Sequence, residues 1–320
     1  MRTKTWGTLT VASGLVLAGC GAADEGTTTA AQTSAADEVR TVEHAMGTAE
    51  IEGAPERVVV LDTGELDATL ALGVTPVGAV RTSVSDELPG LVAEAGVDPA
   101  EIENVGTIEE PDLEAITALE PDLILTNVVR HEALYDQLHQ IAPTVMAENI
   151  AVTWKENLEL TGEALDRTDE AGQLLDEYQA RAEEVGARFG DPAATEVSVA
   201  RFIDGASVRL YGAGSFIGTV MADVGFSRPP VQQVDDFFVE VSQEQVDQAD
   251  GGLLFYGAYG EDGQNALSQV TGGGLWQSLT AVQQGRAFEV DDDRWFLGLG
   301  PLGAGLVLDD LEGFAQQREG

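Results

Sequence analysis

Short apolar runs and stretches with helical spacing alternate along the chain. Residues 58–61 (VVVL) follow the breaker Pro55 and form a β-branched run that is typical of a buried strand. Residues 64–73 (GELDATLALG) place leucines near helical spacing and close on a glycine, and residues 74–80 (VTPVGAV) return to a strand pattern. Because this alternation repeats, we predict an α/β protein whose ligands lie at the strand ends.

An internal repeat divides the chain into halves. Residues 112–127 (DLEAITALEPDLILTN) and 242–257 (SQEQVDQADGGLLFYG) align without a gap, 130 positions apart. Each copy has a glutamate in its first helical turn, Glu114 or Glu244, followed by a short helix, a turn and an apolar strand. The repeat predicts two related lobes.

A helical segment separates the two copies. Its apolar stripe has spacings of four, four, three and four residues and consists of Leu174, Tyr178, Ala182, Val185 and Phe189. We therefore expect Rossmann-like lobes at residues 41–153 and 193–320, joined by one long helix within residues 154–192. A single helical connector predicts a stiff molecule with a ligand cleft between the lobes.

The N-terminal residues have the pattern of a secretion signal. Arg2 and Lys4 precede an uncharged stretch of about fifteen residues, short of the roughly twenty that span a bilayer core. We predict that residues 1–19 are a signal peptide that is removed.

The only cysteine follows this stretch. Residues 17–20 (LAGC) resemble the lipobox of bacterial lipoproteins, in which Cys20 would become the first residue and carry acyl chains on the outer face of the cell membrane. The alternative is a secreted protein with one free thiol. Residues 20–40 are rich in Gly, Ala, Thr and acid, and we interpret them as a flexible tether.

The charge is strongly negative. The net charge is −40, and Lys4 and Lys155 are the only lysines. Nucleic acid is therefore excluded as the partner. An acidic, lysine-poor exterior also suggests a high-salt habitat, where ions screen self-repulsion.

Common catalytic and metal motifs are absent from the sequence. Residues 212–218 (GAGSFIG) fit neither a dinucleotide loop nor a nucleophile elbow around Ser215, so a tight strand-to-helix turn is the better interpretation. His44, His131 and His139 do not form a metal-ligand spacing. We therefore expect no bound metal and no catalytic residue.

Arginines and aromatic residues gather where predicted strands end, and this edge faces the cleft of an α/β lobe. Such side chains suit a rigid, anionic, ring-bearing chelate, since arginine pairs with oxyanions and stacks on rings. Surface ion pairs with the many acids are the alternative, except at Arg201, which lies inside an apolar strand and needs a partner. The candidate ligand contacts are Arg81, Asn127, Arg130, Trp154, Arg201, Arg209, Tyr211, Tyr256 and Trp295.

Six segments in order resemble the iron-siderophore substrate-binding proteins of ABC importers, which share the fold of vitamin B12 and ferric-siderophore binders. They include RVVVLDTGELDATLALGVTPVGA, EPDLILTN, WKENLELTGEAL and LWQSLTAVQQGRAFEVDDDRW. The resemblance implies two Rossmann-like lobes that bind a ferric siderophore in a shallow cleft, without catalysis or cofactor, and we expect a monomer. It also implies that Glu114 and Glu244 dock into arginine pockets of the permease dimer.

The resemblance leaves the siderophore class open. Arg201 matches one basic position of catecholate-siderophore binders, and Arg130 lies one position from a second. The third basic position of those proteins corresponds to Val84 or Ser85 in this chain. Haem or a corrinoid is an alternative ligand, with Tyr256, Tyr259 or His131 as possible haem ligands. An exported enzyme acting on an acidic small molecule is a further alternative.

Overall fold

The structure is a computed structural model that describes residues 39–205 and 207–319. The predicted signal peptide and Cys20 lie outside the described residues. Val39 and Arg40, at the end of the expected tether, belong to a hairpin of β1 (Val39–His44) and β2 (Gly47–Glu52). Within the described ranges, no helix combines the length and apolarity needed to span a membrane.

The N-terminal lobe contains a five-stranded sheet in the order β5-β4-β3-β6-β7, with every pairing parallel. The buried run at residues 58–60 forms its central strand, since a parallel sheet is covered on both faces. The strands are β3 (Val58–Val60), β4 (Gly78–Arg81), β5 (Glu103–Thr107), β6 (Leu123–Asn127) and β7 (Thr144–Ala147). The α-helices are α1 (Thr63–Ala71), α2 (Leu91–Glu94), α3 (Leu113–Ala118), α4 (Val128–His131) and α5 (Tyr135–His139).

The C-terminal lobe contains a second five-stranded sheet, in the order β10-β9-β8-β11-β12. Here β9 runs antiparallel to both of its neighbours, while β8, β11 and β12 are parallel. The strands are β8 (Val197–Phe202), β9 (Ser207–Tyr211), β10 (Phe238–Ser242), β11 (Leu253–Ala258) and β12 (Ala287–Glu289). The helical elements include α8 (Phe216–Asp223), η5 (Pro230–Gln232), η6 (Gln243–Ala249), α9 (Gly260–Thr271), α10 (Gly274–Gln277), α11 (Thr280–Gln283) and the π-helical η7 (Asp293–Leu297).

The sequence repeat corresponds to equivalent parts of the two lobes. Residues 112–127 fold as α3 followed by β6, and residues 242–257 fold as η6 followed by β11. Both strands take the fourth position in their sheets. The prediction of two related α/β lobes is therefore confirmed.

The segment expected as one connecting helix forms two. Asp166 adopts a left-handed φ of 60° and ends α6 (Trp154–Leu165), and α7 (Thr168–Arg188) is the long helix. The predicted apolar stripe on α7 is buried, with Tyr178, Ala182 and Val185 in the core of the C-terminal lobe. At the other end of α7, Leu174 packs against the core of the N-terminal lobe.

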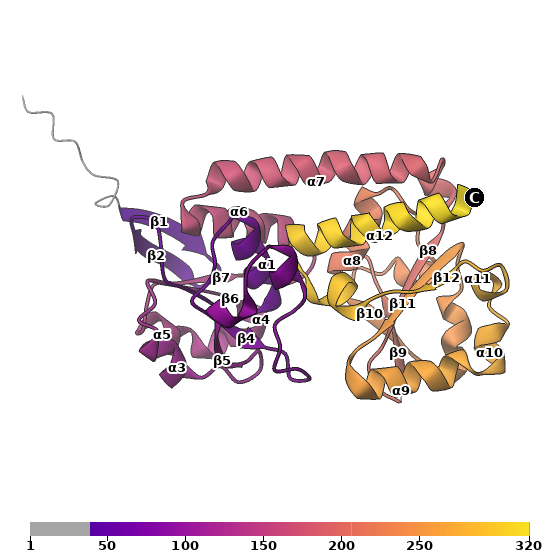
Figure 1. Cartoon of the computed structure of the whole chain (residues 1–320), viewed down its shortest axis with the longest axis horizontal. Helices are drawn as coiled ribbons and strands as arrows, with labels where there is room; N and C mark the ends of the chain where they lie inside the picture. Colours follow the sequence, from indigo (N-terminus) through magenta and orange to yellow (C-terminus); the bar gives the residue numbers. More distant parts are fainter. Residues whose placement is uncertain (1–38, 206, 320) are drawn as a thin grey trace, which may run out of the picture.

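A second helix, at the C-terminal end of the described chain, also packs against both lobes beside the predicted long helix. Helix α12 (Pro301–Glu319) lies alongside α7 (Figure 1). Its Leu306 belongs to the N-terminal core, while Leu308 and Leu311 belong to the C-terminal core. In addition, the fully buried Asp67 of α1 accepts backbone N–H bonds from Gly300, Leu302 and Gly303 at distances of 2.8–3.1 Å.

Candidate functional site

A cleft of about 320 Å³ lies between the lobes, at the carboxyl ends of the strands. Its polar and charged lining residues from the N-terminal lobe are Asp62, Thr63, Thr82, Ser83, Glu109 and Arg130. Those from the C-terminal lobe are Arg201, Arg209 and Tyr211 on β8 and β9, and Tyr259 just after β11, and apolar lining includes Phe216, Phe237, Trp295 and Phe296. The cleft therefore combines cations from both lobes with aromatic rings from the C-terminal lobe.

Arg201 is the most enclosed of the cleft arginines. Its Nε donates to Asp292 Oδ1 at 2.7 Å, and its Nη2 donates to Asp292 Oδ2. The guanidinium also lies 4.6 Å from the ring centroid of Tyr259 and 4.8 Å from that of Phe296. Burial by itself lowers the pKa of Arg201, but hydrogen bonding to Asp292 reverses this effect and raises it. The residue therefore remains a cation inside the wall.

Arg209 adds a more accessible cation. It is the direct cross-strand partner of Arg201. Its Nε lies 3.3 Å from Glu240 Oε1, and its guanidinium lies 4.3 Å from the ring centroid of Phe238. The side chain is 31% exposed, so it retains surface for a ligand.

Arg130 contributes positive charge from the opposite lobe. Its Nε donates to Asp62 at 3.0 Å, and Asp62 is buried beside Glu65. The amide of Asn127 donates to both carboxylates, at 3.1 Å and 3.3 Å. Burial, together with the charge of Asp62, raises the pKa of Glu65 to about 8. Burial and the charge of Asp62 thus favour the protonated form of Glu65, and Asp62 forms the ion pair with Arg130.

Five of the nine sequence-predicted ligand residues line this cleft: Arg130, Arg201, Arg209, Tyr211 and Trp295. Tyr211 places its hydroxyl 3.4 Å from Nη1 of Arg201. Trp295 borders the cleft but is fully buried, and its Nε1 donates to Asp310 at 2.8 Å.

Arg81 and Asn127 do not line the cleft. Arg81 is buried, and its guanidinium donates to the backbone carbonyls of Ala79, Asp86 and Ile102, so it holds the loop after β4. Asn127 is fully buried, and its side-chain oxygen accepts from the backbone N–H of Arg130. Both side chains are thus engaged by other parts of the protein.

Trp154 and Tyr256 also lie elsewhere. Trp154 is buried behind the cleft wall, where its Nε1 donates to Thr219 at 2.9 Å. Tyr256 packs edge-on against Trp276 on the opposite face of the sheet from Phe255, since alternate residues of a strand face opposite sides. The aromatic residue that lines the cleft in this region is Tyr259, directly after β11.

Several lining residues were absent from the sequence-based set of contacts. Thr82 and Ser83 follow β4, and their place directly after a strand was the available signal. Phe237 precedes the edge strand β10, and no sequence pattern pointed to it.

The histidine proposed as a haem ligand is already engaged. His131 is buried, with Nδ1 at 2.6 Å from the Thr126 hydroxyl and Nε2 at 2.7 Å from the carbonyl of Ile108. Within the part of the chain that the structure describes, no group of three or more His, Cys, Asp or Glu residues is arranged to hold a metal ion.

The two glutamates of the repeat occupy matching positions. Glu114 is exposed in the first turn of α3, and Glu244 is exposed in the first turn of η6. Each lobe thus presents one carboxylate at the start of the helix that precedes its fourth strand.

Residues 58–294 match the family model described as periplasmic binding protein. The chain belongs to this family. One relative is the probable siderophore-binding lipoprotein YfiY of Bacillus subtilis (strain 168). It is 38% identical to this chain over 310 residues, and the match covers 93% of each protein.

Further relatives of this periplasmic binding protein bind iron complexes according to their names. The Fe(3+)-citrate-binding protein YfmC of Bacillus subtilis (strain 168) is 30% identical, over 88% of this chain and 87% of that protein. The crystal structure of Staphylococcus aureus SirA complexed with staphyloferrin B superposes with a TM-score of 0.76 at 31% identity, covering 86% of this chain and 97% of that one. These matches confirm the predicted family and two-lobe fold.

Proposed function

We propose that this protein captures a ferric siderophore outside the cell and delivers it to the permease of an ABC importer. The observation that carries the proposal is the cleft in which Arg130 of one lobe faces Arg201 and Arg209 of the other. Ferric siderophores with carboxylate or catecholate donors are anionic, and the arginine fork matches such oxygens bidentately. The names of the relatives support the same ligand class.

The aromatic lining complements this charge. Tyr259, Phe237 and Phe296 provide ring surface around the arginines. Aromatic rings supply large contact areas for a rigid chelate, and the cations they flank remain available for anionic oxygens. The iron is held by the siderophore, so the protein needs no ligand set of its own for the metal.

Anchoring and docking complete the proposal. Cys20 would carry the lipid that keeps the protein at the outer face of the membrane. Glu114 and Glu244 would meet arginines of the permease, because exposed carboxylates on both lobes can fix register and steer encounter. In this arrangement the protein works as a monomer on a dimeric permease.

The binding test is a titration of tryptophan fluorescence with ferric citrate, ferric staphyloferrin B, ferrioxamine B, a ferric tris-catecholate and haem. Trp295 borders the cleft, so a bound iron complex should quench its fluorescence. We expect saturable quenching by at least one ferric siderophore, with a matching isotherm by calorimetry. If only haem bound, with an intense Soret band, the proposed ligand would be haem and not a siderophore. No binding of any of the five by a folded protein would contradict the proposal.

Docking is tested separately by iron uptake in cells. Glu114→Ala and Glu244→Ala should leave siderophore affinity unchanged and lower uptake at least severalfold, whereas the exposed Asp176→Ala on α7 should lower neither. Unchanged uptake in the double variant would remove the docking assignment.

A further inference from the structure

A second chamber continues the cleft on the C-terminal side. Its volume is about 660 Å³, and it shares Thr82, Tyr259 and Leu297 with the arginine-lined cleft. The chambers therefore adjoin, and one ligand can extend from the first into the second.

The charge reverses between the chambers. The second is lined by Glu289, Asp291, Asp292 and Asp293, and none of its lining residues is basic. Asp292 is the partner of Arg201. Within residues 39–205 and 207–319, the other three carboxylates have no lysine or arginine at ion-pair distance.

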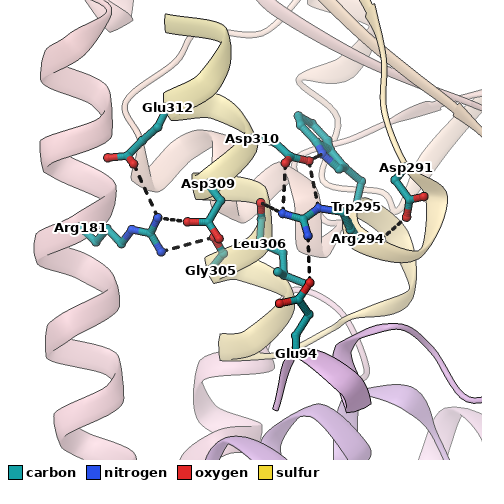
Figure 2. A network of polar contacts seen from close by, with 10 residues as sticks. All are labelled: Glu94, Arg181, Asp291, Arg294, Trp295, Gly305, Leu306, Asp309, Asp310 and Glu312. Carbon is teal, nitrogen blue, oxygen red and sulfur yellow. Dashed lines mark hydrogen bonds and ion pairs between the residues drawn. The ribbon is translucent and has the colours of Figure 1, made fainter. Parts of the chain in front are cut away.

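The nearest arginine in the sequence turns away from this chamber. Figure 2 shows the guanidinium of Arg294 directed to Asp310, Glu94 and the carbonyl of Leu306, at distances of 3.1–3.5 Å. Asp291 accepts only the backbone N–H of Arg294, at 3.1 Å. Among the described residues, Asp292 is thus the chamber carboxylate with an ion-pair partner, while Glu289, Asp291 and Asp293 have no lysine or arginine at that distance.

An unpartnered hydroxyl lies at the boundary of the two chambers. Thr82 is only 6% exposed and borders both, and its Oγ1 has no hydrogen-bond partner among the described residues. A buried hydroxyl without a partner destabilises the fold, and at the boundary of two chambers a ligand group is one partner that could satisfy it. This observation is independent of the acidic residues.

We propose that the second chamber binds a cationic arm of the ligand, a primary or secondary ammonium, while the iron-chelating part occupies the arginine-lined cleft. This inference rests on the proposed function and narrows the substrate to ferric siderophores with an amine. An ammonium can donate to Asp291, Asp293 and Thr82 Oγ1 and lie against the Tyr259 ring. A bare metal ion is not the occupant we propose, since no described acid cluster has metal-binding geometry.

The test uses two pairs of ferric chelates that differ by one positive charge. The first pair joins two citrates through norspermidine, with the middle nitrogen free or acetylated. The second pair is ferrioxamine B, which ends in a primary ammonium, and N-acetylferrioxamine B. For the pair whose core binds, we expect the ammonium form to bind roughly tenfold more tightly in dilute buffer, and less so in molar salt, because ions screen the attraction.

Two variants connect the preference to the chamber. Asp291→Asn with Asp293→Asn keeps the side-chain oxygens that accept from Arg294 and Gly90 but removes two charges. Asp169→Asn with Asp176→Asn makes the same charge change on the exposed side of α7. The preference for the ammonium form should disappear in the first and persist in the second.

Thr82→Val gives a separate readout, since it removes only the hydroxyl. We expect the melting temperature to stay the same or rise while the ammonium form binds severalfold more weakly. The inference is overturned if the two chelates of each pair bind with equal affinity. It is also overturned if the preference for the ammonium form survives both in Asp291→Asn with Asp293→Asn and in Thr82→Val. Either result leaves the proposed function standing. If neither pair binds, the inference is also overturned, and the five-ligand titration decides independently whether the proposed function holds.

Discussion

Arg201 and Arg209 stand directly opposite each other across strands β8 and β9. Like charges in this position destabilise a sheet. Each arginine has its own carboxylate, Asp292 for Arg201 and Glu240 for Arg209, which offsets part of the repulsion. Both side chains nevertheless reach the cleft. The sheet thus maintains two adjacent cations where an anionic ligand would neutralise them.

Arg209→Gln should separate binding from stability. The half-exposed ion pair with Glu240 contributes about 0–1 kcal/mol, and the variant also removes a like-charge contact, so the free energy of unfolding should change by less than about 1 kcal/mol. Affinity for an anionic ferric siderophore should fall roughly tenfold, because a hydrogen bond to a charged group is lost. Urea denaturation and calorimetry measure the two effects. The exposed Arg167→Gln should change neither, and unchanged affinity in Arg209→Gln would remove this residue from the site.

Arg201→Ala should act mainly on the fold. It leaves Asp292 buried without its cation, and breaking a buried pair in this way destabilises proteins by about 3–5 kcal/mol. Replacing both residues in Arg201→Ala with Asp292→Ala should recover much of that stability. A double-mutant cycle from urea denaturation gives the coupling energy. A double variant as unstable as Arg201→Ala would show that the pair is not the cause.

Asp67 should couple the lobes. Asp67→Ala leaves three backbone N–H groups at the start of α12 without their acceptor. Each buried N–H group without a partner costs about 1–3 kcal/mol of stability. We expect a loss of at least about 3 kcal/mol and faster hydrogen exchange at Gly300, Leu302 and Gly303. The exposed Asp176→Ala serves as the control. Unchanged exchange at these three amides would show that the contact does not hold the lobes together.

Stability should fall as the pH rises through the neutral range. Burial raises the pKa of Glu65 to about 8 and that of Asp67 to about 7, above their ordinary values of 4.5 and 3.8. Because the folded state holds these protons longer than the unfolded state, their stabilising effect is complete below about pH 4 and is lost by about pH 8. Each group contributes a slope of about 1.4 kcal/mol per pH unit while only the folded state is protonated.

Glu65→Gln tests this dependence, since the amide imitates the protonated acid. The variant should match the wild type near pH 4 and be more stable at pH 9, as measured by urea denaturation across the range. Glu43→Gln, at an exposed site, should follow the wild-type profile. Equal pH profiles for Glu65→Gln and the wild type would contradict the assignment.

Much of the fold could be predicted because local pattern and burial agree. The run at residues 58–61 and the stripe from Tyr178 to Phe189 are apolar where the structure is buried. The bridge formed by α12 was missed because it depends on long-range contacts, such as Asp67 with Gly300, that leave no periodic signal.

The site was predicted less completely than the fold. Strand-end reasoning pointed to Arg201 and Arg209, and both lie on strands that reach the cleft. It failed for Arg81 and Tyr256 because side-chain direction decides whether a strand-end residue faces the ligand or the protein. Arg81 turns to backbone carbonyls, and Tyr256 lies on the opposite face of its sheet.

The most direct measurement is anomalous diffraction at the iron edge from crystals grown with the ferric siderophore that binds in the titration. The account predicts one iron peak inside the cleft between the lobes, with siderophore oxygens within hydrogen-bond distance of Arg130, Arg201 or Arg209. An iron peak elsewhere on the protein, or a siderophore in the cleft that touches none of these arginines, would contradict it.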